Sequence, residues 1–258
     1  MESWAPGTLC IKFLACNLPI LPHPMSPSLA IQIFLRHKLV LMDKLVSLFS
    51  GGIDSPVACA LMARRFRILP VHFFGGAYAE KGSLERTVEA LERLVPLCAF
   101  QKIVVVPWFP FLDRLVRSEH RSYTCVLCKR GMFKVAERIC QVEGAFGILT
   151  GEALGQKASQ TLPNLLSLSQ GIQYPVLRPL LGTDKLEIER LSKKFGIWSS
   201  SHAGGCKAVP SFPKTAADSK TLEKIFSELD LTGELSRLYA LRAEVKEPRE
   251  VLEVAVNF

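Results

Sequence analysis

Residues 44–65 read KLVSLFSGGIDSPVACALMARR, and three features follow one another in this stretch. Leu45–Phe49 is a short apolar run of the kind that forms a buried parallel strand. Gly51 and Gly52 allow backbone N–H groups to close around an anion, because glycine has no Cβ to obstruct the approach. The apolar run that follows predicts a helix, whose N-terminal dipole adds to the attraction for an anion. The stretch therefore predicts a strand, a phosphate-binding turn and a helix.

The rest of the chain alternates short apolar runs with helical periodicity. Further strands are expected at Ile68–Phe74, Ile103–Val106 and Phe146–Thr150. Apolar residues recur at helical spacing in three groups, which are Leu84, Val88, Leu91 and Val95, then Phe133, Ala136, Ile139 and Cys140, then Ile188, Leu191 and Phe195. Alternating strands and helices predict an α/β fold, with a twisted parallel sheet that carries helices on both faces. Ligands bind beyond the carboxyl ends of the strands in such sheets.

The turn Ser50–Ser55 fits ATP better than a purely structural role. Ser50 and Ser55 supply hydroxyls for phosphate oxygens, and Pro56 occupies a position that the first turn of a helix tolerates. The turn lacks the lysine of a Walker loop. A carboxylate at Asp54 beside a triphosphate predicts Mg²⁺ between them. A tight turn with a capped helix is the structural alternative, which the complete hexapeptide in this context disfavours.

Composition narrows the class of protein. The chain has 258 residues, of which 48% are hydrophobic, and a formal net charge of +8. This length buries at least one large core, and the composition excludes a disordered protein. The positive charge suits a polyanion such as RNA or a nucleotide, although it does not require one. Eight cysteines without a secretory signal point to thiol or metal chemistry in a cytoplasmic protein rather than to disulfides.

Residues 1–41 differ from the rest of the chain. They are apolar but too interrupted by proline for a membrane span, which needs about 20 unbroken residues, and no membrane contact is expected. We expect the native protein to start at Met42, with residues 1–41 as translated upstream sequence; a real N-terminal extension is the alternative. Residues 42–212 are expected to form the nucleotide-binding domain, and residues 213–258 a helical tail packed on it.

Four stretches, in order along the chain, resemble one family. Ser50–Ser55 matches the SGGxDS signature of the PP-loop ATP pyrophosphatases. Thr150–Leu165 (TGEALGQKASQTLPNL), Leu177–Leu191 (LRPLLGTDKLEIERL) and the lone Cys206 resemble the catalytic domain of the tRNA 4-thiouridine synthases, the ThiI family. The resemblance runs from Lys44 to about residue 225. It implies a PP-loop fold, which is Rossmann-like and of the adenine nucleotide α-hydrolase type. It also implies an ATP-dependent transfer of sulfur to a tRNA uridine, with AMP and pyrophosphate as products.

The resemblance assigns roles to individual residues. Asp54 matches a family residue essential for adenylation, Lys185 a lysine required for activity, and Cys206 a cysteine that handles sulfur. Lys185 would neutralise the charge that develops on the α-phosphate. An N-cap role for Asp54 and a solvated position for Lys185 are the structural alternatives. The ATP contacts that the resemblance implies are Leu48, Phe49, Ser50, Gly51, Gly52, Ile53, Asp54, Ser55, Phe73, Phe74, Lys129, Gly151 and Gln160.

Cys125 and Cys128 are spaced so that both thiols face one side of a turn that leads into a helix. The neighbouring Lys129 and Arg130 and the helix N-terminus would favour their thiolates. With Cys206 they cannot close a four-thiolate zinc site, but they can hold three corners of an iron–sulfur cluster. Archaeal-type family members that resemble this chain have that arrangement.

Two other interpretations of the thiols stay open. Cys125 and Cys128 can form a redox dithiol, or Cys140 can complete a zinc site with them and Cys206. Packing roles are expected for side chains on apolar faces or in an apolar strand, namely Cys59, Cys98, Cys140 and His72. His202, close to Cys206 in sequence, is expected to be a loop residue rather than a base. Cys10 and Cys16 belong to the segment before Met42.

Full-length ThiI family members carry a ferredoxin-like domain and a THUMP domain before the PP-loop domain, and some carry a rhodanese domain after it. The sequence quoted above resembles the PP-loop domain alone. The resemblance therefore implies a separate THUMP-type protein that binds tRNA and a donor of sulfide or persulfide, and it is compatible with a homodimer. Two alternative functions are an adenylating enzyme of a small-molecule sulfur pathway, such as that of thiamine thiazole, and a nucleotide-binding partner subunit without turnover.

Overall fold

The computed structural model describes residues 42–98, 100–199 and 205–258. Its centre is a six-stranded sheet in the order β5-β4-β1-β2-β3-β6. The strands are β1 (Lys44–Phe49), β2 (Arg67–Phe74), β3 (Ile103–Pro107), β4 (Gly147–Leu149), β5 (Val176–Leu177) and β6 (Ala243–Val245). The first five pair in parallel, whereas β6 pairs antiparallel with β3 at one edge. The predicted α/β fold is confirmed, although the sequence predicted neither the short strand β5 nor the antiparallel edge strand β6.

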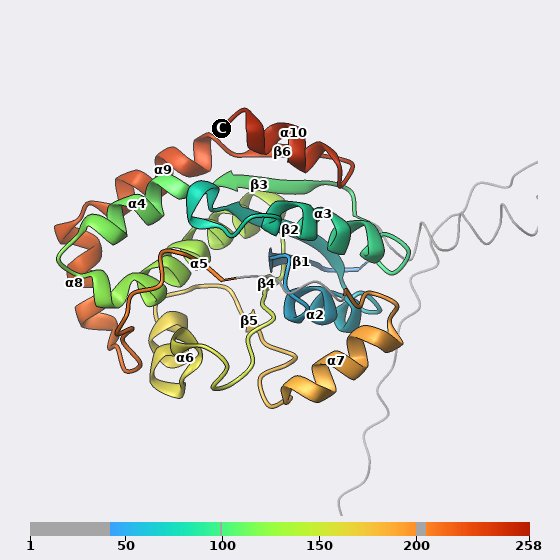
Figure 1. Ribbon diagram of the computed structural model, residues 1–258, viewed down its shortest axis with the longest axis horizontal. Coiled ribbons are helices and arrows are strands. Elements are labelled where there is room, and N and C mark those ends of the chain that lie inside the picture. The colour runs from blue at the N-terminus through green and yellow to red at the C-terminus, as the bar shows by residue number, and fades with distance from the viewer. Residues whose placement is uncertain (1–41, 99, 200–204) are drawn as a thin grey trace, which may run out of the picture. The chain divides into compact units, whose positions relative to one another are not determined.

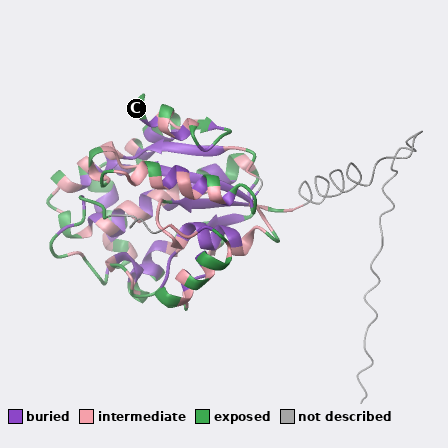
Figure 2. Ribbon diagram, turned by 45° about the vertical axis from the view of Figure 1, so that its right-hand side comes forward, coloured by how far each residue is buried: buried purple, intermediate pink, exposed green. Residues whose placement is uncertain are grey.

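Helices cover both faces of the sheet (Figure 1). Alternate residues of a strand point to opposite faces, so Leu45 and Phe49 of β1 enter one core while Val46 and Leu48 enter the other. The first core is completed by α2 (Asp54–Met62), α3 (Ser83–Leu94), α7 (Lys185–Lys194) and α10 (Glu250–Val256). The second is completed by α4 (Phe109–Arg117), α5 (Thr124–Glu143), α6 (Leu162–Ser169), α8 (Ser219–Glu228) and α9 (Leu231–Ala240). Figure 2 shows the strands buried between these layers. None of the helices in the described residues has both the length and the apolar character that crossing a bilayer requires.

The segment 213–258 contains helices α8, α9 and α10 and also strand β6, which its charged sequence does not predict. Arg130 of α5 attaches α8 to the sheet domain. The Arg130 side chain is almost completely buried. Its guanidinium donates to the carbonyl oxygens of Ser167 at 2.8 Å and Gln170 at 3.1 Å, and it forms an ion pair with Glu223 of α8. Three carbonyl or carboxylate partners satisfy this buried cation, so the contact stabilises the packing of α5, α6 and α8.

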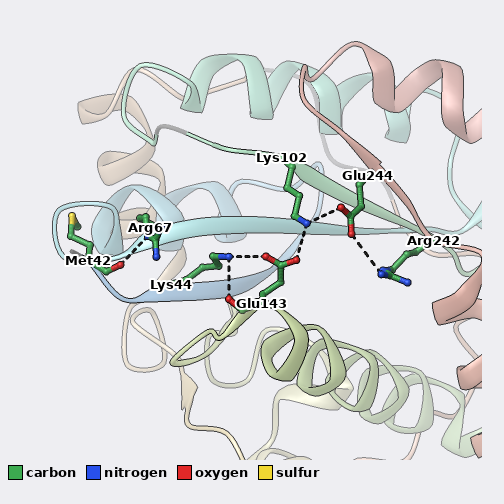
Figure 3. Close-up of polar contacts among 7 residues, drawn as sticks. All are labelled: Met42, Lys44, Arg67, Lys102, Glu143, Arg242 and Glu244. Atoms are coloured by element: carbon green, nitrogen blue, oxygen red, sulfur yellow. Dashed lines mark hydrogen bonds and ion pairs between the residues drawn. The ribbon is translucent and has the colours of Figure 1, made fainter. Parts of the chain in front are cut away.

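A series of ion pairs joins the amino ends of the strands (Figure 3). Glu143, the last residue of α5, pairs with Lys44 of β1 and with Lys102, just before β3, each at 2.7 Å. Lys102 also pairs with Glu244 of β6 at 2.7 Å, and Arg242 approaches the same carboxylate at 3.7 Å. The Lys44 and Glu143 side chains are only 15% and 14% exposed. These contacts fasten α5 and the edge strand β6 to one end of the sheet.

Because Glu143 forms these ion pairs as a carboxylate, we predict that the folded protein loses stability in acid. Burial alone would raise the pKa of Glu143, but the hydrogen bonds from Lys102 and Lys44 outweigh burial and hold the pKa below the ordinary value of 4.5. Because the folded pKa is the lower one, the carboxylate stabilises the fold above the unfolded pKa, and this contribution is lost as the pH falls through the folded pKa. Glu143→Gln should lower the free energy of unfolding at pH 7 by about 1–3 kcal/mol. It should also flatten the decline of that free energy between about pH 5 and pH 3.

Urea unfolding followed by circular dichroism across this pH range measures both effects. Glu119→Gln is the matched control, because the Glu119 side chain is 87% exposed and should contribute little to stability. An acid slope that is the same in Glu143→Gln and in the unmodified protein would contradict the prediction.

Candidate active site

The strand order switches between β1 and β4, and we call the carboxyl edge of the sheet at this point the crevice. From β1 the chain proceeds to β2 and β3 on one side, and it later returns to β4 and β5 on the other side. The strand order therefore switches direction between β1 and β4, and ligands of open α/β sheets bind at such a switch. The motifs Ser50–Ser55 and Thr150–Leu165 begin directly after these two strands. Both motifs thus reach the crevice.

The loop Ser50–Ser55 is closed by its own serines. Ser55 Oγ donates to Ser50 O at 3.1 Å and accepts from Ser50 N at 3.0 Å. The proton of the Ser55 hydroxyl is therefore donated inside the loop. Both hydroxyls were expected to face phosphate, and of the two only the exposed Ser50 hydroxyl remains accessible. Helix α2 starts at Asp54, and no side chain of the described residues caps it. Its first N–H groups keep their capacity for an anion.

Gly151 packs directly on the start of α2. A Cβ at this position would lie 2.5 Å from backbone atoms of Asp54 and Ser55, closer than atoms approach without a shift of the chain. Only glycine permits this approach, which holds the loop after β4 against the loop after β1. Gly51 is similarly close to α3, where a Cβ would lie 3.0 Å from Ser83 O. These two predicted ATP contacts therefore also fix the loops that surround the crevice.

Two predicted catalytic residues meet at this edge. Lys185 Nζ donates to Asp54 Oδ1 at 2.9 Å, although 131 positions separate the two residues. Lys185 is the first residue of α7, and the start of that helix is fixed by Asp184, which accepts from the Glu187 N–H at 2.8 Å. The Lys185 and Asp54 side chains are 49% and 21% exposed, so both remain open to a ligand. Asp54 is the first helical residue rather than the N-cap, so the alternative of a capping role is wrong.

A buried carboxylate and a buried amide lie in the loop after β4. Glu152 is 1% exposed, and its Oε2 accepts from Arg178 Nε at 2.8 Å and from Thr150 Oγ1 at 3.0 Å. The predicted ATP contact Lys129 has its Nζ 3.8 Å from Glu152 Oε1. That Oε1 and Gln160 Oε1 are buried without a hydrogen-bond partner among the described residues. Buried polar atoms are normally paired, so the two oxygens mark a place where a ligand can bind.

Lys157 is affected both by charges near the phosphate loop and by the charge of Cys206. Lys157 is exposed, but nearby protein atoms partly desolvate its ammonium and lower the pKa of Lys157. The positive charges of Lys129 and Lys185 lower this pKa further, whereas Asp54 and Cys206 raise it. Lys157 therefore lies within electrostatic range of both the predicted adenylation residues and the predicted sulfur-handling cysteine.

Lys157, Glu152 and Arg178 were not predicted from the sequence as residues of the active site. A usable signal was present, because Glu152 comes three positions after β4 and Arg178 comes directly after β5. Charged residues at the carboxyl ends of parallel strands are candidates for the site by position alone.

The end of β2 holds Phe73 and Phe74, two of the residues expected to contact ATP. The Phe73 ring is 9% exposed and packs edge-on against Trp108, with ring centroids 4.8 Å apart. Its ring belongs to the core, because β2 alternates and directs Phe73 into the layer of α4 and α5. Phe74 is partly buried and accepts a hydrogen bond from Trp108 N at 2.8 Å. Leu48 and Phe49 also have buried side chains, so only their backbone is available to a ligand.

Three cysteines gather at the same edge of the sheet. Cys206 forms an isolated antiparallel bridge with Ala79, directly after the short 3-10 helix η1 (Gly76–Tyr78) that follows β2. Cys125 and Cys128 lie at the start of α5. The charge of Cys206 raises the pKa of both thiols, so all three lie within electrostatic range of one another. The fold thus brings the distant cysteine to the CxxC pair.

Burial dominates the protonation of the CxxC pair. It raises the pKa of Cys125 and raises that of Cys128 to about 12. Trp108 Nε1 donates to Cys128 Sγ at 3.2 Å and offsets only part of this effect. Lys129 lowers the pKa of Cys128 as expected, but burial outweighs it, so the expectation that the surroundings favour the thiolate is wrong for this pair. Arg130 is engaged with α6 and α8 instead, and desolvation outweighs the charge of Lys129.

The thiols suit an iron–sulfur cluster by their chemistry. Three thiolates repel one another, and a bound cation would remove this repulsion. However, no group of three or more histidine, cysteine or acidic side chains in residues 42–98, 100–199 and 205–258 is arranged to hold a metal ion. Cys140 lies twelve positions beyond Cys128 in the same helix, about 18 Å along its axis, and this excludes the zinc alternative.

The remaining thiols and histidines have simpler places. The packing thiols are confirmed, since the three buried side chains are those of Cys59, Cys98 and Cys140. His72 Nδ1 lies 3.2 Å from Phe49 O, and burial lowers the pKa of His72 to about 4, which confirms a core histidine. The expectations for residues 1–41, including Cys10 and Cys16, and for His202 lie outside the described residues.

Known proteins resemble this chain over most of its described length. The family described as thiamine biosynthesis protein (ThiI) matches residues 41–231. A probable tRNA sulfurtransferase of Methanothermobacter thermautotrophicus is 37% identical over 201 residues, which are 76% of this chain and 52% of that protein. A probable tRNA sulfurtransferase of Thermococcus kodakarensis is 40% identical over 168 residues, which are 61% of this chain and 42% of that protein. The chain spans about half the length of the relatives it matches.

A solved structure agrees with these matches. It is the crystal structure of a 4-thiouridine synthetase in complex with RNA and with bound ATP. It matches with a TM-score of 0.72 and 31% sequence identity, over 78% of this chain and 54% of that one. The likeness supports the fold class that the strand order defines.

The buried Glu152–Arg178 pair generates a prediction on stability. Glu152→Gln should lower the free energy of unfolding by about 2–4 kcal/mol, because it leaves the guanidinium of Arg178 without its counter-charge. The Arg178 side chain is 13% exposed, so water replaces the lost partner poorly. Chemical denaturation measures the change. Glu187→Gln removes an exposed ion pair with Arg190 and is the matched control, with an expected effect below about 1 kcal/mol. Equal effects of the two substitutions would refute the role assigned to Glu152.

Proposed function

Because this chain belongs to the ThiI family, we propose that it activates a uridine of tRNA with ATP and replaces a carbonyl oxygen of the base with sulfur. The relatives named as probable tRNA sulfurtransferases and the 4-thiouridine synthetase with RNA and ATP support this choice of acceptor and nucleotide. Within the chain, the proposal is carried by the 2.9 Å contact between Lys185 and Asp54, at the sheet edge to which the three thiols also come. The charges of Asp54 and Cys206 both act on Lys157, which supports a single site for adenylation and sulfur transfer.

The first step is adenylation of the base. The triphosphate binds over Ser50–Ser55, where the start of α2 provides backbone donors and a positive dipole. The carbonyl oxygen of the uridine attacks the α-phosphorus, the bond to pyrophosphate breaks, and the base becomes an AMP ester. Lys185 stabilises the negative charge that grows on the α-phosphate, and Lys129 and Lys157 add to the positive potential. The ester turns the former carbonyl oxygen into a good leaving group.

The second step is displacement by sulfur. Sulfide attacks the activated carbon, the carbon–oxygen bond breaks, and AMP leaves with the former carbonyl oxygen. Uridine, ATP and HS⁻ are thus converted to thiouridine, AMP and pyrophosphate, without any change in oxidation state. If sulfur arrives as a persulfide on Cys206, a second thiol must cleave the sulfur–sulfur bond and is oxidised to a disulfide with Cys206. Cys125 and Cys128 are within electrostatic range for that role.

Two cofactors fit this scheme. Asp54 would hold Mg²⁺ against the phosphates, because a carboxylate beside a triphosphate needs a cation between them. Cys125, Cys128 and Cys206 would hold three corners of an iron–sulfur cluster, which leaves one iron open to bind sulfide. The mutual effect of the three thiols on their pKa supports the same set of ligands.

The proposed partners follow from the proposed acceptor. The formal charge of +8 supports binding of tRNA. We propose that a separate THUMP-type protein helps to hold the tRNA, that a donor supplies sulfide or a persulfide, and that the reaction takes place in the cytoplasm. A homodimer is compatible with this arrangement.

Asp54→Asn should decrease the formation of AMP and pyrophosphate by at least about 100-fold, because the loss of charge removes the anchor for the metal beside the phosphates. Chromatography of the nucleotide products after incubation with ATP, Mg²⁺ and tRNA measures this. Asp43→Asn is the matched control, since Asp43 is exposed at the other end of β1 and should leave the rate unchanged.

Two results would decide against the proposal. Accumulation of ADP in place of AMP would mean that ATP is cleaved at a different phosphate. AMP formation that requires a small sulfur-pathway acceptor, in a protein that binds no RNA, would establish the alternative of a small-molecule enzyme.

Protein purified without oxygen should contain iron and acid-labile sulfide and should absorb visible light, because the three thiols hold a cluster. Iron and sulfide assays measure the content per chain. Cys206→Ser should lower it by at least about half, since one of three ligands is lost. Cys98→Ser, at a buried packing thiol, should leave the iron content unchanged. Iron-free protein that still forms thiouridine would favour persulfide chemistry on Cys206 instead.

A further inference from the structure

Phe212 is 88% exposed, more than any other large hydrophobic residue in the part of the chain that the structure describes. Single exposed apolar side chains are common on proteins and need no explanation by themselves. Phe212 differs in two respects, because the segment that carries it is fixed to the rest of the protein and because that segment adjoins the thiols.

The segment around Phe212 is anchored on both sides. Before it, Lys207 N donates to Tyr78 O at 2.8 Å, and after it, Lys214 N donates to Ser122 O at 2.8 Å. Further side chains on this segment enter the protein interior, namely Ala208, Pro210 and Ala217. The prolines on either side of the ring also restrict the backbone. The ring therefore stands in solvent on a rigid support, and such preorganisation favours binding.

Both anchors lie next to the thiols that the proposed function uses. Cys206 directly precedes Lys207, and Ser122 lies three positions before Cys125. Phe212 is six positions from Cys206, so their Cα atoms are within about 20 Å even if the chain between them is fully extended. An RNA whose modified base reaches the thiols therefore has its neighbouring nucleotides within reach of this ring.

The proposed reaction needs such a support. The carbonyl carbon of a stacked base is covered by its neighbours, so enzymes that modify a base take it out of the stack. Proteins hold unstacked RNA bases on aromatic rings and hold the adjoining phosphates with cations. Lys207 and Lys214 are exposed and flank the ring, and neither forms an ion pair within the described residues. Lys214 Nζ lies 5.5 Å from the centre of the Tyr123 ring, which keeps this cation beside the start of α5.

We infer that Phe212 is a stacking subsite for an unpaired base of the RNA, at or next to the modified uridine, and that Lys207 and Lys214 bind the adjoining phosphates. The inference rests on the proposed function, because it describes how the same site receives its acceptor. It adds a binding residue outside the motifs of the phosphate loop and the thiols.

A protein partner would need a larger apolar surface that includes Phe212. Leu162 and Leu166 of α6 are 65% and 63% exposed, and Thr161 Oγ1 donates to Thr215 O at 2.5 Å, so α6 adjoins the end of the same segment. A docking face for a protein would need these leucines together with Phe212, because protein interfaces bury a continuous apolar patch. A stacking subsite needs only the ring and its flanking cations.

The test uses the full chain and a hairpin RNA with one unpaired uridine next to the fluorescent base 2-aminopurine. Phe212→Ala should weaken RNA binding roughly five- to one-hundred-fold, which corresponds to about 1–3 kcal/mol for one stacked base, and should remove the quenching of 2-aminopurine. Phe212→Trp should stay within about threefold of the unmodified protein, because the larger ring still stacks. Lys214→Gln should reduce the salt dependence of binding by about one unit of slope, whereas Phe212→Ala should leave that slope unchanged.

Phe146→Ala is the matched control, because Phe146 is 48% exposed and lies directly before β4, at the opposite edge of the sheet. It should change neither RNA binding nor quenching, and ATP affinity without RNA should be the same in all variants. RNA binding by Phe212→Ala that equals that of the unmodified protein would overturn the inference alone. Equal losses of RNA binding in Phe212→Ala and in a Leu162→Ala, Leu166→Ala double variant would overturn it, because the ring would then act as part of a broad apolar face and not as a stacking subsite. An unmodified protein that cleaves ATP but binds no RNA would refute the proposed function itself.

Discussion

The backbone of Gly151 touches the backbone of Asp54 and Ser55 where a side chain would not fit, since a Cβ would lie only 2.5 Å away. This contact joins the loop after β4 to the loop after β1, across the switch in strand order. Glu152 and Gln160 follow Gly151 in the same loop, so their places relative to Asp54 depend on it. A side chain at residue 151 would separate the two loops and would open the crevice between the groups that line it.

Charge is concentrated around this crevice. The Asp54–Lys185 pair is accessible to solvent, while Glu152 lies beneath the surface and is held by Arg178 and Lys129. Lys157 lies within electrostatic range of both the loop and Cys206. Cations gathered in this way attract a polyphosphate, and the buried oxygens of Glu152 and Gln160 without partners mark groups whose hydrogen bonds a ligand can complete. This arrangement suits the nucleotide that we propose as the ligand of the site.

The thiols obey a different constraint. Burial raises the pKa of Cys125 and Cys128, so the pair stays protonated at neutral pH unless a cation binds or the thiols become more exposed. A protonated thiol is a poor nucleophile, and the arrangement therefore protects the pair from reaction in the absence of a metal or a sulfur donor. Cys206 is exposed and is held by the turn after β2, where an incoming donor can reach it.

Local sequence was sufficient for four of the six strands that the structure describes, for the glycine turn and for the family, because hydrophobic period and the absence of a Cβ are properties of neighbouring residues. The strand Lys44–Phe49 and the helix that begins at Asp54 agree with that reading. The contact between Lys185 and Asp54 joins positions 131 residues apart. The family resemblance identified both residues, but only the fold brings them into contact.

Other features could not be derived from local sequence at all. The Ser55 hydroxyl turns into its own loop, the Phe73 ring enters the core, Arg130 binds α6 and α8 instead of the thiols, and burial reverses the expected effect on Cys128. Each of these depends on which distant segment packs against the side chain, because packing sets both the distance between charges and their access to water.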